Sequence, residues 1–488
     1  VWDAVDQTAL YPLTRGLRFE GGEPAHNVNA LGEVPNSSWY TNRMAVATVP
    51  PERVAQGPCE RSIDTSATWL VQGGKVGGFN PGFIIEDTSD GRKYLLKFDR
   101  STQRERPTAA DVIGSKVYWA AGFSTPCNEV VYFDPDNLRI EAGAMKKTDV
   151  GDERPLVMAD LQAAMSAAPR VDGRVRAAAS LFLSGEPIGP FRYEGTRDDD
   201  PNDVVPHQHR RELRGSKVIA SWINHFDSRE ANTLTTFMPV SDAEGSLGYV
   251  QHHILDFGDS LGSLWAFDAM SRRLGHAYYF DMQQVFVDFL TLGAIVRPWE
   301  RVELHPVFGY FDAENFDPEA WKPGYPNPAF VKMDRLDAYW GAKIVSRFSD
   351  EHIRALVGTG EFSNPDHARY LEETLRARRD AIVNHYLRAV SPFDAPAIRG
   401  DEFCATDLLI AGGYIPAARS VLETKLAGGP WQTARTEDGV VCRALPVGAR
   451  SAVLQLRARR HDQDDPAPPA IFHLRRETDG WRLVRIER

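Results

Sequence analysis

The chain has 488 residues, of which 42% are hydrophobic and 25% are charged, and this composition is ordinary for a soluble globular protein with two to four domains. Its formal net charge of -11 argues against general nucleic-acid binding, which needs a cationic surface. The most apolar run, residues 285–296, is too short to span a bilayer and is interrupted by Asp288, so we expect no transmembrane segment.

The four cysteines are Cys59, Cys127, Cys404 and Cys442. None has the C-x-x-C spacing that is typical of zinc sites. Cys59 with Cys127 and Cys404 with Cys442 are the two pairings to consider, and four buried free thiols are the alternative. The even count and the absence of an initial Met favour an exported or periplasmic protein, and a cytoplasmic location is the alternative.

Residues 1–66 are rich in Pro, Gly, Asn and other polar residues, with scattered aromatic side chains. This pattern predicts an extended arm that packs its aromatic residues, such as Trp2, Tyr11, Trp39 and Tyr40, on a neighbouring part of the protein.

Residues 67–100 predict three antiparallel strands near 68–71, 83–85 and 94–98. A Gly-rich turn lies between the first two strands, with Gly73, Gly74, Gly77 and Gly78. A tight turn at 89–91 precedes the third strand, which contains Lys97.

Lys97 lies in an otherwise apolar strand, and burying a lone ammonium is costly without a partner. The next segment predicts a helix capped by Thr108, and this helix offers Asp111 as the partner. After it, the apolar runs 130–133 and 138–141 predict a hairpin.

Helices are predicted near 158–167 and 216–223, and from about residue 262 to 392 the pattern is helical, with a long helix that begins near Pro365. Residues 392–399 predict a linker, and 400–488 predict a small β domain with a turn at 478–480. His207 and His209 suggest either a metal site or, more simply, a basic rim that receives phosphate.

Two short motifs lie on either side of a polar insert, one near residue 225 and the other near residue 256. The first contains His225, Phe226 and Asp227, with Asn232 five residues after the Asp. The second is Asp256-Phe257-Gly258. An acid, an amide and a second acid in this order suit phosphoryl transfer, in which one carboxylate accepts the proton of the attacking hydroxyl and the other two groups bind magnesium.

These motifs, after a Gly-rich turn and a strand lysine, resemble the protein-kinase-like superfamily, whose loop has the form H-R-D-x-x-x-x-N and is followed by D-F-G. The resemblance implies an α+β fold with two lobes, a small antiparallel β lobe and a helical large lobe. It assigns residues 67–142 to the small lobe and 143–392 to the large lobe, to which the sequence adds the arm (1–66) and the C-terminal β domain (400–488). It also implies ATP and Mg²⁺ as cofactors.

By the same resemblance, each motif residue receives a role. Asp227 is the catalytic base, Asn232 and Asp256 are metal ligands, and Arg229 lies where many members carry a phosphate-facing Lys. Lys97 and the backbone N–H groups of the glycines bind phosphates, and Asp111 pairs with Lys97 in place of the family's Glu.

The sequence departs from the family in two respects. Phe226 replaces the family's Arg, so we do not expect control by a phosphate in the activation loop. The gap from Asn232 to Asp256 is long, and an extra hairpin through residues 241–245 accounts for it. Both departures indicate an atypical, bacterial-type branch.

Three functions are compatible with these residues. The first is an ATP- and Mg²⁺-dependent phosphotransferase that acts on a hydroxyl of a protein or small molecule. The second is a degenerate kinase-like module that binds nucleotide or a partner without turnover, and the third is a metal-dependent hydrolase. The presence of Lys97, Asp227 and Asp256 together favours the first, although fold alone does not fix the substrate.

Overall fold

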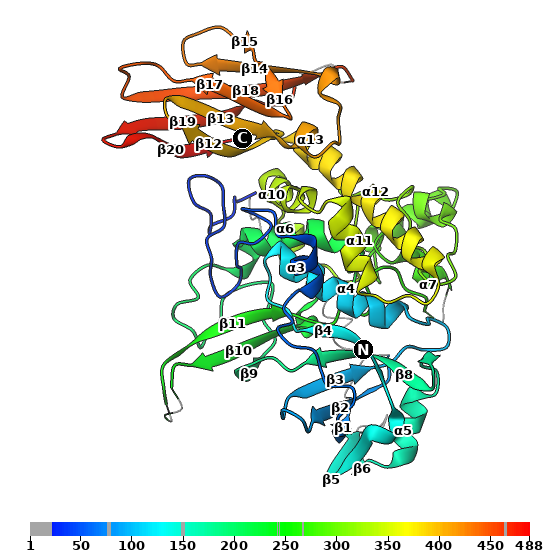
Figure 1. Ribbon diagram of the computed structural model, residues 1–488. Coiled ribbons are helices and arrows are strands. Elements are labelled where there is room, and N and C mark those ends of the chain that lie inside the picture. Colours follow the sequence, from blue (N-terminus) through cyan, green and yellow to red (C-terminus); the bar gives the residue numbers. More distant parts are fainter. Residues whose placement is uncertain are drawn as a thin grey trace.

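The computed structural model of the chain describes residues 22–75, 80–147, 152–241, 243, 245–265, 268–462 and 466–488. In these ranges it is a mixed α/β protein with four β-sheets and a block of helices between the N-terminal and C-terminal sheets (Figure 1). None of the described helices combines the length and the apolar content that a bilayer crossing needs.

The first sheet has the strand order β4-β8-β3-β2-β1-β5-β6, with β7 paired to β8. Its strands are β1 (Trp69–Gly74), β2 (Gly82–Asp87), β3 (Lys93–Lys97), β4 (Asn128–Phe133), β5 (Leu138–Lys147), β6 (Glu153–Pro155), β7 (Arg170–Val171) and β8 (Arg174–Leu181). The antiparallel β1-β2-β3 unit agrees with the sequence prediction. The sheet continues to Leu181, beyond the predicted boundary at residue 142.

The predicted hairpin of 130–133 with 138–141 is wrong. β4 pairs with β8 in antiparallel orientation, and β5 pairs with β1 in parallel orientation. The short 3-10 helix η2 (Pro135–Asn137) carries the chain between them. Phe133 and Leu138 lie on either side of this turn, and each is buried beside a different strand. The apolar pattern therefore predicts that strands exist but not which strands they pair with.

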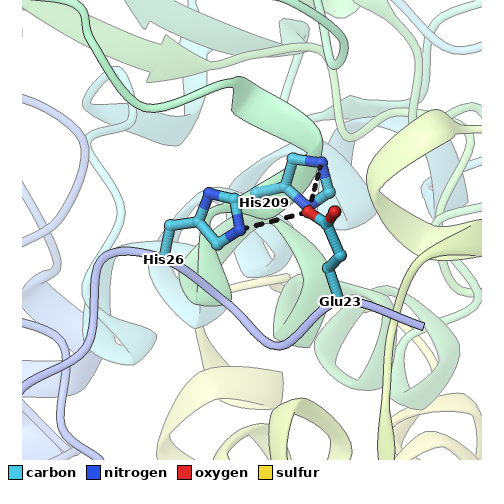
Figure 2. A group of neighbouring side chains, drawn as sticks. All are labelled: Glu23, His26 and His209. Carbon is cyan, nitrogen blue, oxygen red and sulfur yellow. Dashed lines mark ion pairs between the residues drawn. The ribbon is translucent and has the colours of Figure 1, made fainter. Parts of the chain in front are cut away.

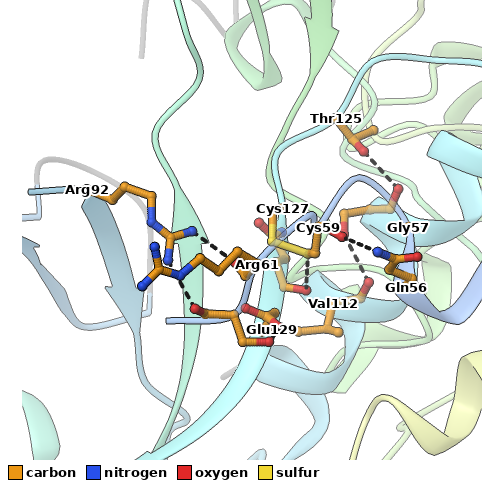
Figure 3. Close-up of a disulfide and its surroundings, with 12 residues drawn as sticks. Gln56, Gly57, Cys59, Arg61, Arg92, Val112, Thr125, Cys127 and Glu129 are labelled. Carbon is orange, nitrogen blue, oxygen red and sulfur yellow. Dashed lines mark hydrogen bonds between the residues drawn. A yellow bond between two sulfur atoms is a disulfide. The ribbon is translucent and has the colours of Figure 1, made fainter. Parts of the chain in front are cut away.

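The helix α4 (Arg106–Ala121) follows β3 and is buried along its whole length. It begins two residues before Thr108, and the backbone N–H and hydroxyl of Thr108 both donate to the Asp99 carboxylate. The Cys59–Cys127 disulfide links the arm to the residue before β4, beside this helix (Figure 3).

The arm contains α3 (Pro51–Gln56) and packs its aromatic side chains, as the sequence predicts. Tyr40 is buried with its ring 5.2 Å from that of Trp340. Trp39 stacks on His252, with the ring centroids 3.5 Å apart. Trp2 and Tyr11 lie outside the described residues.

A second, three-stranded sheet has the order β11-β10-β9. Its strands are β9 (Glu186–Gly189), β10 (Thr233–Pro239) and β11 (Gly248–Ile254). The β10-β11 hairpin is the extra hairpin that the long gap between Asn232 and Asp256 predicts.

The helical block surrounds the largest hydrophobic cluster, which includes Trp222, Phe226, Phe257 and Trp340. Gly215 permits close contact of two of its helices, because a Cβ there would lie 2.6 Å from the Trp340 ring. The helices of this block are η3 (His207–His209), α6 (Arg211–Trp222), η4 (Glu230–Asn232), α7 (Asp268–Arg273), α8 (Met282–Thr291), η5 (Pro298–Arg301), α9 (Pro328–Val331), α10 (Arg335–Ser346), α11 (Asp350–Gly358) and α12 (Pro365–Ala389). The helix α5 (Met158–Met165) instead packs Leu161 and Met165 into the core of the first sheet.

The C-terminal region forms two sheets around a core that includes Phe403, Leu454 and Phe472. Its elements are β12 (Phe393–Arg399), β13 (Glu402–Asp407), α13 (Leu408–Ala411), η6 (Ala417–Arg419), β14 (Ser420–Leu426), β15 (Gln432–Thr433), β16 (Thr436–Glu437), β17 (Val440–Ala444), β18 (Ser451–Arg460), β19 (Ala470–Glu477) and β20 (Gly480–Glu487). The predicted linker at 392–399 is wrong, because β12 occupies it and pairs with β13.

The second disulfide joins Cys404 and Cys442, which lie opposite each other on β13 and β17. Both cysteine pairings considered from the sequence are therefore confirmed.

Candidate active site

Lys97 is the last residue of β3 and only 7% of it is exposed. Its Nζ lies 3.1 Å from Oδ2 of Asp111 and 3.0 Å from Oδ1 of Asp256. Burial lowers the pKa of the Lys97 ammonium, but the two carboxylates outweigh burial and raise this pKa above its ordinary value. Lys97 is therefore a charged group fixed between two acids from distant parts of the chain.

Asp111 lies in α4 and is completely buried. Its Oδ1 accepts hydrogen bonds from Lys97 Nζ at 3.1 Å and from the backbone N–H of Phe257 at 3.0 Å. Burial raises the pKa of Asp111, and Lys97 opposes this effect. The carboxylate thus connects the strand lysine to the Asp256-Phe257-Gly258 segment.

Gly114 brings α4 against Phe257, since a Cβ at this position would lie 2.5 Å from the Phe257 Cβ. The Phe257 ring also lies 5.2 Å from the Tyr118 ring and 5.3 Å from the His225 ring. The Tyr118 hydroxyl is 3.1 Å from Nδ1 of His225. This packing holds together the helix, the loop that begins at His225 and the segment that begins at Asp256.

Asp256 lies two residues after the end of the hairpin strand β11. It has a left-handed backbone conformation, with φ of 55°. A non-glycine residue in this conformation costs about 1 kcal/mol or more, and such residues are frequent at functional sites. Lys97 lowers the pKa of the Asp256 carboxyl to about 2, although burial acts in the opposite direction. Its side chain is 46% exposed, so this acid faces outward from the Lys97 pair.

Asp227 and Asn232 lie in the loop after α6. The Asn232 amide Nδ2 donates to the Asp227 carboxylate Oδ2 and to the Asp227 carbonyl oxygen, both at 2.8 Å. Arg229 Nε lies 3.1 Å from the other carboxylate oxygen of Asp227. Burial raises the pKa of Asp227 to about 6, while Arg229 and Asn232 oppose this rise.

The β10-β11 hairpin brings Asn232 and Asp256 together. Thr233 and Ile254 are paired in the register of the hairpin, and the Asn232 carbonyl accepts a hydrogen bond from Leu255 N–H at 2.9 Å. Asn232 therefore lies beside the residue that precedes Asp256. Because its Nδ2 bonds Asp227, its Oδ1 is the side-chain atom suited to a cation.

The predicted glycines divide into two pairs. Gly73 and Gly74 belong to strand β1, and a Cβ at Gly74 would lie 3.0 Å from Lys146 Cγ on β5, so this pair packs against a neighbouring strand. Gly77 and Gly78 lie outside the described residues.

Sequence reasoning gave no role to Lys75 or Gly82, which lie near this site. Lys75 Nζ donates to the Asn80 carbonyl at 3.1 Å, and Asp256 raises the pKa of Lys75 against a larger lowering by burial. Gly82 lies opposite Lys97 in the strand register, and a Cβ there would come 2.2 Å from the Leu96 carbonyl oxygen. Asp259 is 4.0 Å from Arg106 Nη2. Lys75 was detectable as a cation inside the Gly-rich stretch.

His209, a residue considered for metal binding, groups with His26 and Glu23 (Figure 2). Glu23 Oε2 lies 3.3 Å from His26 Nε2 and 3.8 Å from His209 Nε2. However, Arg214 Nη2 donates to Nδ1 of His209 at 2.6 Å, so the proton of neutral His209 is on Nε2. A metal needs the lone pair of that nitrogen, and the trio therefore serves better as a cluster of polar contacts that holds the arm. His207 instead bonds Asp203 at 2.6 Å.

No protein-family model matches the chain, and neither does any curated protein. Among solved structures, the proinflammatory kinase CtkA of Helicobacter pylori is similar over 67% of this chain and 99% of its own, with 11% identity and a TM-score of 0.35. Titin kinase with its flanking domains is similar over 84% of this chain and 77% of its own, with 11% identity and a TM-score of 0.19. These neighbours are kinases, but the superpositions are too loose to carry an argument about function.

Proposed function

We propose that the chain is an ATP- and Mg²⁺-dependent phosphotransferase of kinase-like fold that moves the γ-phosphate to an acceptor hydroxyl. The observation that carries this proposal is the meeting of Lys97, Asp111 and Asp256 in one ion-pair cluster, beside the linked pair Asp227 and Asn232. A strand, a helix, a loop and the end of a hairpin each contribute to it, which favours a built site over chance proximity.

The residues present fit the proposed cofactors. Asn232 Oδ1 and the half-exposed Asp256 carboxylate are oxygen donors of the kind that Mg²⁺ prefers. Lys97 and Lys75 are the cations suited to the phosphates of a nucleotide. Bound Mg²⁺ would neutralise negative charge that develops on the phosphates during transfer.

Asp227 is the group suited to accept the proton of the acceptor hydroxyl. With a pKa of about 6, it is mainly ionised at neutral pH but remains basic enough to take a proton. Asn232 fixes the orientation of its carboxylate, and Arg229 contacts the second oxygen. In this proposal Arg229 leaves that oxygen when the acceptor binds.

A nucleotide-binding module without turnover is the second candidate. The observation that favours it is that Asn232 and Arg229 contact the two carboxylate oxygens of Asp227. If Arg229 does not leave Asp227, a hydroxyl has no access to the base.

We also propose, with the two disulfides as support, that the protein is exported to an oxidising compartment.

Thermal unfolding with and without ATP and Mg²⁺ tests the binding step. A ligand that binds only the folded form adds roughly 3–4 kcal/mol at a hundred- to thousand-fold excess over its Kd. We expect such stabilisation for the wild type and its loss when ATP is supplied with EDTA in place of Mg²⁺. An unfolding curve that is unchanged by the nucleotide contradicts both candidates.

Transfer of radiolabelled phosphate from ATP to pools of candidate acceptors separates the two candidates. Asp227→Asn keeps the shape of the side chain, so we expect it to retain nucleotide stabilisation but to lower transfer by about 100-fold or more. Asp479→Asn, at the exposed turn between β19 and β20, is the matched control. Nucleotide stabilisation without wild-type transfer supports the binding module, and undiminished transfer in Asp227→Asn shows that the base is another group.

A further inference from the structure

A cavity of about 440 Å³ lies on the second sheet, between its outer face and the loop at 199–203. On the sheet side it is lined by Ile188, Phe237 and Val250, and on the loop side by Asp199 and Asp200. Phe237 and Val250 are cross-strand partners, so their side chains share one face of the sheet. One wall of the cavity is thus apolar and the other is acidic.

Trp39 of the arm and His252 also line the cavity. Trp39 stacks on His252 and lies under the Arg210 guanidinium, which is 4.8 Å from the Trp39 ring centroid. Arg210 is in turn fixed by the buried Asp203 carboxylate at 3.0 Å. These contacts hold Trp39 and Arg210 in place beside the cavity.

The open edge of β11 borders the same cavity. His252 N–H donates to the Ser38 carbonyl at 3.0 Å, so the backbone groups of His252 point away from β10. Val250 lies two residues earlier, and in an antiparallel pair its N–H and C=O have the same outward direction. β11 is the last strand of its sheet, and in the described part of the chain no strand pairs with Gly248 to Val250 on this side.

The charge of the loop side comes from consecutive acidic residues, Asp198 to Asp200. The Asp199 side chain is 69% exposed and pairs with Arg197 at 2.7 Å. The Asp200 Oδ1 accepts a hydrogen bond from the Asn202 backbone at 2.9 Å. The loop therefore presents more negative than positive charge along the cavity rim.

We propose that this cavity and the β11 edge bind an extended peptide segment of a partner protein with alternating basic and apolar side chains. Such a segment adds a strand to an open sheet edge through main-chain hydrogen bonds, with Val250 as one partner. Because successive side chains of a strand point to opposite faces of the sheet, the basic ones enter the cavity, where their aliphatic stems lie against Phe237 and their charged ends face Asp199 and Asp200, and the apolar ones lie on the opposite face. The site is separate from Lys97 and Asp227, and the proposal does not depend on phosphotransfer.

Fluorescence anisotropy with a labelled peptide of alternating Arg and Val residues tests the proposal, in the absence of nucleotide. We expect saturable binding, and we expect the double variant Asp199→Lys with Asp200→Lys to weaken it by about tenfold or more, because reversed charges then oppose the basic side chains. Asp479→Lys together with Asp401→Lys is the matched control, with the same change in net charge on exposed sites of the C-terminal sheets. An equal loss in the control double variant overturns the proposal, since it reduces binding to general charge attraction.

Two measurements on the wild-type protein complete the test. The same peptide with alternate backbone nitrogens methylated, made in both registers, is expected to lose binding in the register that faces β11 and to keep it in the other. Equal binding of both methylated peptides overturns the edge-pairing step. The second measurement is competition by spermine at the same total positive charge as the peptide. Complete displacement of the peptide would identify a site for small polycations and would overturn the proposal.

Discussion

Lys97 is held by two acids that differ in their access to water. Asp111 is completely buried, while the Asp256 side chain is 46% exposed. A buried charge that loses its buried partner remains uncompensated, whereas water can replace part of an exposed one. The two acids therefore contribute differently, Asp111 mainly to stability and Asp256 to a surface that a ligand can reach.

Asp111→Asn is expected to lower the free energy of unfolding by about 2–4 kcal/mol, because the Lys97 ammonium loses its buried counter-charge. In the Asp111→Asn background, Lys97→Met should cost less than it does in the wild type, with a coupling energy of about 1–3 kcal/mol. Denaturant unfolding of the four proteins in this cycle provides the measurement. Strictly additive losses would show that Lys97 and Asp111 do not stabilise each other.

The pairing of Lys97 with Asp111 could be anticipated from the sequence, because a lysine inside an apolar strand needs a counter-charge and the next helix offers one. The contribution of Asp256 to the same cluster could be inferred only through family resemblance. Residues 97 and 256 are far apart in the chain, and no local pattern encodes a contact between them. Lys75, by contrast, was visible in the sequence as a cation inside the Gly-rich stretch and was overlooked.

At the scale of elements, α12 controls the end of α6, from which the loop with Asp227 begins. Arg378 of α12 donates to the carbonyl oxygens of Trp222 at 2.9 Å, Ser221 at 2.6 Å and Asp312 at 2.7 Å. Its guanidinium also lies 3.6 Å from the Phe316 ring centroid. The last carbonyls of a helix have no partners within the helix, so Arg378 supplies partners where α6 stops.

Arg378→Met is expected to lower the free energy of unfolding by about 2–4 kcal/mol, because buried carbonyl oxygens lose their donors. Arg378→Lys should recover little of this loss, since one ammonium cannot reproduce the planar geometry of the guanidinium. Arg369→Met on the same helix is the control, because the Arg369 side chain is 63% exposed. Thermal unfolding measures all three, and equal shifts for Arg378→Met and Arg369→Met would exclude the capping role.

The sequence predicts elements better than it predicts their partners. The strands β1 to β3, the helix α6 and the helix α12 each follow from a local pattern of apolar residues and turns. The pairings of β4 and β5 do not, because either strand can bury its apolar side chains against several neighbours. β12 was taken for a linker because Pro392 precedes it and Pro396 lies within it, and prolines interrupt a strand pattern.

At the scale of the whole molecule, the β10-β11 hairpin has two roles. Near its turn, Phe237 and Val250 line the proposed peptide site. At its other end, the pairing of Thr233 with Ile254 brings Asn232 beside the segment of Asp256. Its length departs from the family pattern, and this departure was visible in the sequence. The covering of one face by Trp39 was not visible, because it depends on the path of the arm across the molecule.

The fold also buries several histidines, and this determines how the molecule responds to acid. Burial lowers the pKa of His225 to about 4, of His252 to about 3 and of His253 to about 4, from an ordinary value of 6.5. Between about pH 6.5 and pH 4, these groups bind protons in the unfolded chain but not in the folded one. Stability is therefore complete above pH 6.5 and is lost as the pH falls toward 4, by at most about 1.4 kcal/mol per pH unit for each histidine.

His253→Gln isolates one part of this effect. His253 lies 2.8 Å from the Ser124 hydroxyl and 2.9 Å from the Thr236 hydroxyl, and a glutamine amide preserves hydrogen-bonding capacity without a titrating group. We expect His253→Gln to flatten the dependence of unfolding free energy on pH between about 6.5 and 4, by up to about 1.4 kcal/mol per pH unit, even if it destabilises the protein at neutral pH. His461→Gln, at an exposed position, should leave the slope unchanged. Denaturant unfolding across this pH range compares the slopes, and a His253→Gln slope equal to that of the wild type would mean that the hairpin does not keep His253 neutral.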